Sequence, residues 1–334
     1  MNQYKFLLYF LLVGILHGVS ASAQSASTGS GQAWSPMRNV EIIVSSVPGG
    51  SNDNTGRQIE KALNELKLVP ASTSIVGKPG GGGNIAMAYT NQHAGDGHYL
   101  MVATSSINSN HIIGASKLTY NDFTPIAMLV NDYVVFAVKA DSPLKTAKDL
   151  MAQFKTKPQS VAMGFANTFG GSRHVAAGLL IKALGGNPRD LKTVVFKGSA
   201  EAISALLGGH LEMVIIGAGN AVAHVQSGRM RVLAVTSPQR LAGTLSFVPT
   251  WRELGADVVS GSWRGVMGPK ELPAPQLAYW ENAMRQLAQN AGWKTDLERN
   301  YWSEYFAIGA QLRKELEKDY VDTRKILLDI GLAK

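Results

Sequence analysis

The sequence predicts an α/β protein in which mostly parallel sheets are flanked by helices. Short apolar segments alternate with amphipathic helical segments along most of the chain, which is the pattern of repeated β–α units. The apolar segments are continuous runs rich in Val, Ile and Ala, as expected of parallel strands buried on both faces. The chain has 334 residues, more than one compact core usually contains, so we expect two domains.

The first residues have the features of a secretory signal peptide. Lys5 precedes an apolar run over residues 6–16, and Ala21-Ser22-Ala23 forms an A-x-A cleavage site. The apolar run is shorter than the roughly 18 residues that a membrane span requires. We therefore expect residues 1–23 to be a signal peptide cleaved after Ala23. The Ser- and Gly-rich residues 24–35 are then a flexible leader of an exported, periplasmic protein.

Eight strands and several helices can be placed along the mature chain. One helix starts near Asn52, another starts near Ser172, and a third starts at Thr146, where Thr146 and Asp149 form a capping box. From Ala274 to the end the pattern is nearly all helical. The expected strands are residues 40–46, 72–76, 99–105, 133–140, 160–165, 193–196, 213–216 and 231–236.

Composition excludes several classes of function. Cysteine is absent, so there are no thiolate metal sites and no cysteine nucleophiles. The formal charge is +8, but Lys and Arg are spread along the chain, so we expect no nucleic-acid partner. A positive field that attracts small anions fits the same charge. The sequence has no nucleotide-binding or zinc-binding motif, and its seven histidines lack metal-ligand spacing, so we expect no cofactor and no metal.

Four glycine-containing junctions stand between an expected strand and an expected helix. In each, the chain enters a helix whose first N–H groups lack partners and whose dipole end is positive. A single junction of this kind is more often a turn with an N-cap, but four in one chain favour cradles for an anion, which we expect to be a carboxylate. The junctions are Pro48-Gly49-Gly50-Ser51, Lys78-Pro79-Gly80-Gly81-Gly82-Gly83-Asn84, Thr168-Phe169-Gly170-Gly171-Ser172 and Lys197-Gly198-Ser199.

The chain resembles the periplasmic receptors of tripartite tricarboxylate transporters, the Bug family, from about Trp34 to its C-terminus. The order and spacing of several short motifs carry this resemblance. They are PGGS with Asp53 and Arg57, the PGxGGNI run from Pro79, Asp96-Gly97, Asp122-Phe123-x-Pro125, His174, Lys197-Gly198-Ser199, Gly208-Gly209, Leu233-Ala234-Val235-Thr236 and Val248-Pro249-Thr250.

The resemblance implies a two-lobed periplasmic binding protein of the Venus-flytrap kind, type II-like. Lobe 1 would comprise residues 36–138 and 236–334, and lobe 2 residues 139–235. Such a receptor is not an enzyme. It is a monomer that captures a small carboxylate in the cleft between the lobes and delivers it to integral-membrane transporter subunits.

The resemblance also implies a set of ligand-binding residues in two groups, one from each lobe. The lobe 1 group is Gly49, Gly50, Ser51, Gly82, Gly83 and Asn84, with Thr104 and Ser105 nearby. The lobe 2 group is Thr168, Phe169, Ser172 and His174. We add Arg173, which stands where many relatives have a neutral residue.

Three positions bear on the ligand. Relatives often have Asp or Gly where this chain has Ile216, so an acidic partner for an ammonium group is missing. Arg173 is either a contact for a second carboxylate or a solvated helix residue, and Phe169 is either an apolar wall or interdomain packing. A dicarboxylate or an aromatic carboxylate fits best, with terephthalate as one candidate, whereas citrate-like ligands fit less well.

Two other functions remain open. The protein is a ligand-loaded sensor subunit for a membrane histidine kinase, or it is an exported hydrolase that uses His174 with a neighbouring Ser. His174 lies just beyond a glycine junction, although a lone helical His is more often structural.

Overall fold

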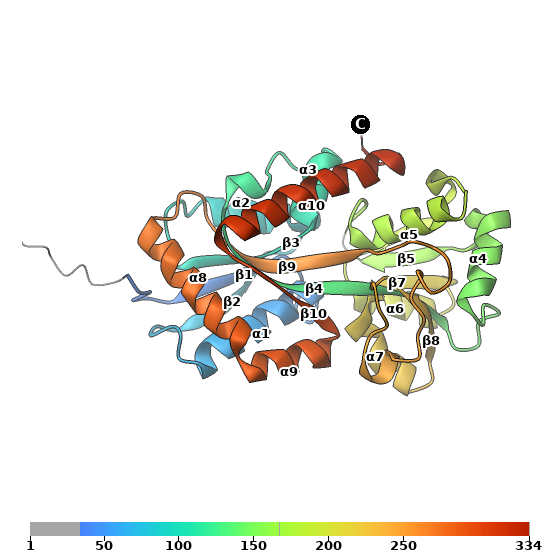
Figure 1. Cartoon of the computed structure of the whole chain (residues 1–334), viewed down its shortest axis with the longest axis horizontal. Coiled ribbons are helices and arrows are strands. Elements are labelled where there is room, and N and C mark those ends of the chain that lie inside the picture. The colour runs from blue at the N-terminus through green and yellow to red at the C-terminus, as the bar shows by residue number, and fades with distance from the viewer. Residues whose placement is uncertain (1–33, 167, 334) are drawn as a thin grey trace, which may run out of the picture. The chain divides into compact units, whose positions relative to one another are not determined.

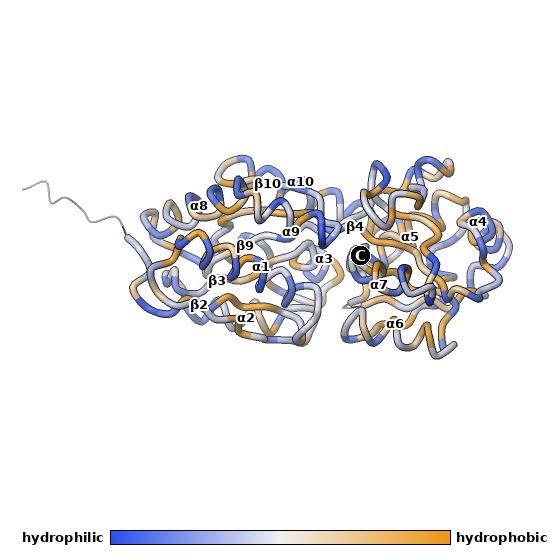
Figure 2. The backbone as a smooth tube through the Cα atoms, turned by 90° about the horizontal axis from the view of Figure 1, so that it is seen from below, coloured by the Kyte–Doolittle hydropathy of each residue, from blue (hydrophilic) through white to orange (hydrophobic). Residues whose placement is uncertain are grey.

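The computed structural model describes residues 34–166 and 168–333, so the predicted signal peptide and most of the leader lie outside the described residues. The described residues form two lobes joined by long strands (Figure 1). Figure 2 views them at right angles to Figure 1, with α1, α2, α3 and α8 in one lobe and α4, α5, α6 and α7 in the other.

Lobe 1 has a sheet with helices on both faces. One core lies between the sheet and α1, α8 and α9, and a second lies between the sheet and α2, α3 and α10. Its strands are β1 (Val40–Val44), β2 (Thr73–Gly77), β3 (Tyr99–Thr104), the first part of β4 (Thr124–Lys139), β9 (Gly261–Gly268) and β10 (Trp302–Ala307). Its helices are α1 (Ser51–Glu65), α2 (Asn84–Asn91), α3 (Ser106–Ile112), α8 (Ala274–Gln289), α9 (Ala291–Asn300) and α10 (Gly309–Asp329).

Lobe 2 has the same layered arrangement. One core lies beneath α4 and α5, and the other lies beneath α6 and α7. The predicted capping box is present at α4, where Thr146 Oγ1 accepts from the Asp149 N–H and the Asp149 carboxylate accepts from the Thr146 N–H. The elements are α4 (Ala147–Thr156), β5 (Met163–Ala166), α5 (Ser172–Ala183), β6 (Thr193–Phe196), α6 (Ser199–Leu207), β7 (Met213–Gly217), α7 (Ala218–Gln226), β8 (Met230–Val235) and the second part of β4.

The α/β class is confirmed, but the sheet is more mixed than predicted. β1 runs parallel to β2 and β3, and β5 runs parallel to β6 and β7. β4 is antiparallel to β7, β8, β9 and β10. The parallel units of both lobes are therefore attached to long antiparallel strands at the centre of the molecule, and these strands also connect the lobes.

The change of partners along β4 marks the boundary between the lobes. β4 pairs with β9 as far as Tyr133, which lies opposite Gly261, and with β7 from Val134 onward. Further along the chain, Trp251 and Val258 still pack in the core of lobe 2. We therefore propose that lobe 2 comprises residues 134–260, whereas the crossings that we expected lie near residues 138 and 235.

Two strands were not predicted from the sequence. β10 lies inside the region expected to be helical. It is a strand because it pairs with β4, where its aromatic and apolar side chains pack. β9 is rich in glycine, which weakens the strand signal. Gly265 of β9 explains this composition, since a Cβ there would lie 2.1 Å from the carbonyl oxygen of Ala127 in β4.

Candidate functional site

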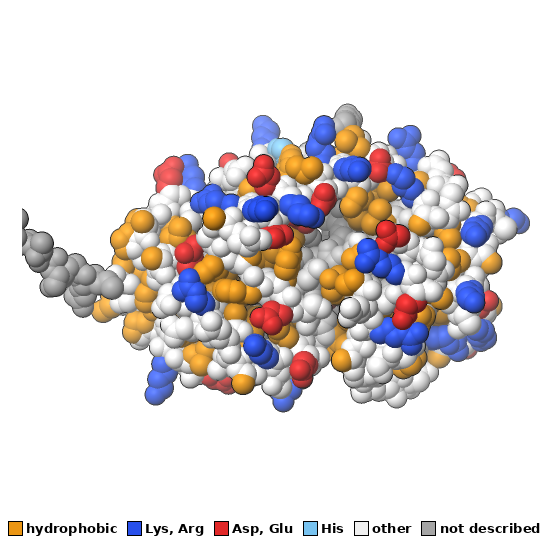
Figure 3. Space-filling model, in the orientation of Figure 1, with side chains coloured by type: hydrophobic (Ala, Val, Ile, Leu, Met, Phe, Trp, Pro, Cys, Tyr) orange, Lys and Arg blue, Asp and Glu red, His pale blue; other side chains and the backbone are white. Residues whose placement is uncertain are grey.

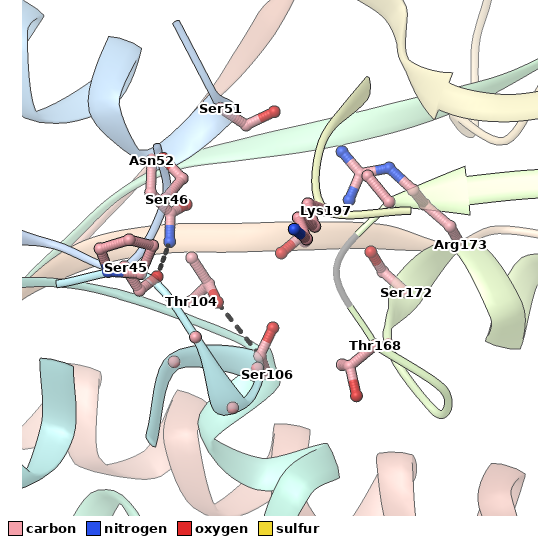
Figure 4. Close-up of a pocket in the computed structure, with 18 of the residues that line it drawn as sticks. Ser45, Ser46, Ser51, Asn52, Thr104, Ser106, Thr168, Ser172, Arg173 and Lys197 are labelled. Carbon is pink, nitrogen blue, oxygen red and sulfur yellow. Dashed lines mark hydrogen bonds between the residues drawn. The ribbon is translucent and has the colours of Figure 1, made fainter. Parts of the chain in front are cut away.

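Three strand-to-helix junctions of lobe 1 lie side by side at one edge of its sheet. β2, β1 and β3 are parallel neighbours, so their carboxyl ends meet at this edge, and each is followed by a helix. The junctions present small polar side chains, namely Ser45, Ser46 and Ser51 beyond β1 and Thr104 and Ser106 at the end of β3. Figure 4 shows these side chains around one space.

The four-glycine run is the sharpest turn of this edge. The φ angles of the run are 122° at Gly80, 57° at Gly81, 65° at Gly82 and 108° at Gly83. Residues with a Cβ rarely adopt these angles. The side-chain amide of Asn110 donates to the Gly82 carbonyl oxygen at 2.9 Å and holds the run in place. All four glycines line the cavity, including Gly82 and Gly83, which were predicted to bind the ligand, and the absence of side chains exposes the backbone to the cavity.

Gly49 and Gly50, the glycines of the first loop that were predicted to bind the ligand, do not line the cavity. The Gly49 N–H donates to Asp53 Oδ2 at 2.9 Å, and the Gly50 N–H donates to the Val47 carbonyl at 2.9 Å. Both N–H groups are used within the loop, and neither glycine lines the cavity. Of the predicted residues in this loop, only Ser51 reaches the cavity, so Gly49 and Gly50 shape the turn that positions it.

Asn84 and Ser105, also predicted to bind the ligand, do not line this cavity. The Asn84 side chain donates to the carbonyl of Ala115 at 2.7 Å. Ser105 Oγ lies 2.9 Å from Ser262 Oγ and lines a different cavity, beside α10. Thr104, in contrast, lies in the cavity wall, as predicted.

Lobe 2 faces these junctions with the start of α5. Thr168, Ser172 and Arg173, which were predicted to bind the ligand, line the cavity, and Lys197 joins them from the junction before α6. Figure 4 shows this group across the space from the serines of lobe 1. The lobes are close here, because a Cβ on Gly82 would lie 3.4 Å from Thr168 Cβ.

Arg173 is the most unusual member of the site. It is only 6% exposed, and its Nε has no hydrogen-bond partner among the described residues. Burial lowers the pKa of its guanidinium, Arg264 lowers it further, and Asp132 raises it. Arg173 is therefore not a solvated helix residue, since a buried donor without a partner is unfavourable until an acceptor arrives.

The cavity between the lobes has a volume of about 450 Å³, which suits a small organic molecule. Hydroxyl groups and glycine backbone dominate its wall. The lining residues are Ser45, Ser46, Val47, Ser51, Asn52, Pro79, Gly80, Gly81, Gly82, Gly83, Thr104, Ser106, Ala166, Thr168, Gly171, Ser172, Arg173, Lys197, Ser262 and Arg264.

The charged groups of the wall all have one sign. Arg173, Lys197 and Arg264 line the cavity, and none of the described lining residues is Asp or Glu. Arg264 forms an ion pair with Asp132, which lies outside this lining, and Arg264 donates to Thr55 Oγ1 at 3.0 Å. The charged side chains of the described lining are thus all positive.

Sequence reasoning did not select thirteen of the lining residues. Seven of these have polar or charged side chains: Ser45, Ser46, Asn52, Ser106, Lys197, Ser262 and Arg264. Lys197 belongs to one of the four glycine-containing junctions, and Ser45 and Ser46 are the last two residues of the expected strand 40–46, so position alone could have identified these three. Arg264 lies within β9, which has no clear strand pattern, and no local signal marks it.

Phe169 and His174, both predicted to contact the ligand, line a separate cavity of about 270 Å³ with Ile330 and Leu332. His174 Nδ1 accepts from the Gly170 N–H at 3.2 Å, and its ring stacks on Phe165 with centroids 5.1 Å apart. Burial lowers the pKa of His174 to about 4. A neutral, internally bonded ring away from the main cavity gives no support to a role as a general base.

The buried His174 predicts a pH dependence of stability. Its folded-state pKa of about 4 lies below the unfolded value of about 6.5, so the unfolded state binds more protons in this window. The free energy of unfolding should therefore fall by up to about 3 kcal/mol between pH 6.5 and pH 4.

The variant His174→Gln should lose this component, which chemical denaturation at several pH values would measure. The exposed His210→Gln is a matched control in the same lobe. Equal pH slopes for wild type and His174→Gln would contradict the assignment.

No helix in residues 34–166 and 168–333 is both long and apolar enough to cross a membrane. Within the same ranges, no cluster of three or more His, Asp or Glu side chains is arranged to hold a metal ion.

Comparison with known proteins agrees with this architecture. Protein BugT of Bordetella pertussis is 29% identical over 266 residues, covering 78% of each chain. A solved R. palustris protein with adipate is 23% identical, with a TM-score of 0.81 over 89% of this chain and 99% of that one. MatC from Rhodopseudomonas palustris with bound malate is 22% identical, with a TM-score of 0.74 over 87% and 99% of the two chains.

The two solved structures share the fold of this chain, which confirms the predicted periplasmic-binding-protein architecture. A family profile decides the relationship at the level of sequence. The profile described as the tripartite tricarboxylate transporter family receptor matches residues 56–332, which is most of the chain. The chain therefore belongs to the tripartite tricarboxylate transporter receptor family, a family of solute-binding receptors.

Proposed function

We propose that this receptor captures a small dicarboxylate between its lobes. The observation that carries the proposal is the wall of the cavity, where three cationic side chains occur without an acidic one. Asp132 compensates one of these cations from outside the wall, so two positive charges remain. A ligand with two carboxylates neutralises them, which a monocarboxylate does not.

The two carboxylates have separate places in this proposal. One binds at the lobe 1 edge, near Ser51, Gly82 and Thr104, where glycine backbone and hydroxyl groups offer donors. The other binds at Arg173, whose Nε lacks a partner, through a charge-assisted hydrogen bond. A ligand held in this way bridges both lobes and stabilises their closed arrangement.

The wall favours a flexible dicarboxylate over an aromatic one. Ile216, expected near the ligand, is fully buried in a core of lobe 2, and Phe169 lines another cavity. Neither residue therefore gives the cavity an apolar wall for an aromatic ring, and terephthalate fits the proposal only as a rigid dicarboxylate. Amino acids are disfavoured, because an ammonium group would be buried without an acidic partner. The adipate and malate of the two solved neighbours belong to the same chemical class.

The signal-peptide pattern and the family support a periplasmic protein that works as a monomer and passes its ligand to integral-membrane transporter subunits. Delivery to a sensor kinase uses the same cleft, and we place it second because the family is defined by transporters. The neighbours of the coding gene distinguish the two, because genes for two membrane transport subunits favour transport.

A thermal-shift panel tests the choice of ligand. Aliphatic dicarboxylates should raise the melting temperature of the wild type by several degrees, which corresponds to about 3–4 kcal/mol at ligand concentrations 100 to 1,000 times Kd. Matched monocarboxylates, amino acids and aromatic carboxylates should give smaller shifts. Stabilisation by glutamate or aspartate alone, with no response to aliphatic dicarboxylates, would contradict the proposal.

A further inference from the structure

Asp132 is the acidic group that compensates the cationic wall, and it lies at the boundary between the lobes. Its carboxylate forms an ion pair with Arg264, and the two side chains are only 4% and 3% exposed. Asp132 belongs to β4 and Arg264 belongs to β9. The buried pair therefore connects the two strands that pair with each other beside the crossing between lobes.

Further contacts fix the orientation of Arg264. Its Nη1 donates to Thr55 Oγ1 at 3.0 Å, and its guanidinium lies over the Trp302 ring at 5.3 Å from the centroid. These contacts come from lobe 1, while the same side chain forms part of the cavity wall. Arg264 is thus a fixed positive group whose partner, Asp132, is outside the lining.

Asp132 also lies against lobe 2. A Cβ built on Gly217, the residue before α7, would lie 2.8 Å from Asp132 Oδ2, so a larger residue at position 217 would force this carboxylate to move. The charge of Asp132 also reaches Arg173 of lobe 2, where it raises the pKa while burial and Arg264 lower it. One carboxylate therefore pairs directly with Arg264 and also acts electrostatically on the buried Arg173.

We propose that Asp132 determines how many negative charges the cleft accepts. This inference rests on the proposed function and extends it to a residue outside the cavity wall. With Asp132 charged, the three cations of the wall leave an excess of two positive charges, which suits a ligand with two negative charges. Removing the charge of Asp132 leaves a surplus of three, and the preferred ligand should then have three negative charges.

The test compares two ligands on one propane skeleton, glutarate with two carboxylates and tricarballylate with three. In Asp132→Asn the affinity ratio of tricarballylate to glutarate should rise about tenfold or more over the wild-type ratio. The double variant Asp132→Asn/Arg264→Gln restores the surplus of two and should return the ratio to near the wild-type value. A merely structural role for Asp132 would weaken both ligands together and leave the ratio unchanged.

A second variant, Arg264→Gln, tests the inference even if Asp132→Asn does not fold. Arg264→Gln alone lowers the surplus to one, so the affinity ratio of glutarate to butyrate should fall about tenfold. Calorimetry measures all ratios, and circular dichroism confirms folding. Unchanged ratios in the folded single variants would overturn the inference.

An inorganic arm separates this inference from the proposed function. Thermal stabilisation by sulfate relative to chloride should increase in Asp132→Asn and decrease in Arg264→Gln. If no carboxylate binds the wild type but these shifts occur, the proposed function fails and the inference stands. If glutarate binds and no ratio moves, the proposed function stands and the inference fails.

Discussion

Replacing Arg173 with methionine should weaken dicarboxylate binding about 100-fold, while binding of a matched monocarboxylate changes little. The reason is that truncating one partner of a buried charge pair costs about 2–5 kcal/mol. Methionine keeps much of the volume and the apolar stem of the side chain, so the loss reports mainly on the guanidinium. Calorimetry with adipate and hexanoate gives both affinities.

The same substitution should make the unliganded protein more stable. Arg173 is 6% exposed and its Nε has no partner in the described residues, so the empty site contains an unfavourable buried charge. Loss of binding with a gain of stability is expected of a functional residue and not of a structural one. Arg229→Met, an exposed arginine of the same lobe, serves as the control and should change neither property. Equal weakening of adipate and hexanoate by Arg173→Met would remove Arg173 from the distal site.

Replacing Gly82 with alanine should reduce ligand affinity about tenfold or more, beyond any loss of stability. Gly82 has a φ of 65°, and a Cβ there would lie 3.1 Å from Asn110 Nδ2 and 3.4 Å from Thr168 Cβ in lobe 2. The added methyl group therefore intrudes where the two lobes approach each other and where the backbone is open to the ligand.

Gly228→Ala provides a matched control for this experiment. Gly228 has a φ of 67°, yet nothing lies within 4 Å of a Cβ built on it. Both variants should lose about 1–2 kcal/mol of unfolding free energy from the left-handed backbone. Only Gly82→Ala should also lose affinity, as measured by calorimetry with adipate. If the two variants bind adipate as tightly as wild type, the glycine run is not part of the ligand site.

Much of the fold could be predicted because its signals are local. Continuous apolar runs identified β1 and β7, and the capping box at Thr146 identified the start of α4. β9 and β10 were missed because their strand structure depends on pairing with β4, which is distant in sequence. A glycine such as Gly265 weakens the local strand signal while serving a tertiary contact.

The candidate site was predictable to the extent that it lies at strand-to-helix junctions. Ser51, Gly82 and Thr168 lie within such junctions. Arg173 directly follows one, and all four residues line the cavity. The direction of a side chain or N–H group within a junction is not encoded locally. For that reason Gly49 was predicted to bind the ligand, although its N–H donates to Asp53 within the loop.

The charge balance of the cleft could not be predicted at all from local sequence. It depends on Arg264 and Asp132, which are 132 residues apart and meet only because β4 and β9 pair. Lone charged residues inside strands have no motif that marks them as partners. The number of positive charges facing the ligand is therefore a property of the folded protein.

The most direct test of the account is a crystal structure of the protein with the dicarboxylate that stabilises it most. The account predicts density for one ligand in the cavity between the lobes, with one carboxylate beside Gly82 and Thr104 and the other within hydrogen-bond distance of Arg173. Density with both carboxylates on one lobe, or in the cavity lined by Phe169 and His174, would contradict it.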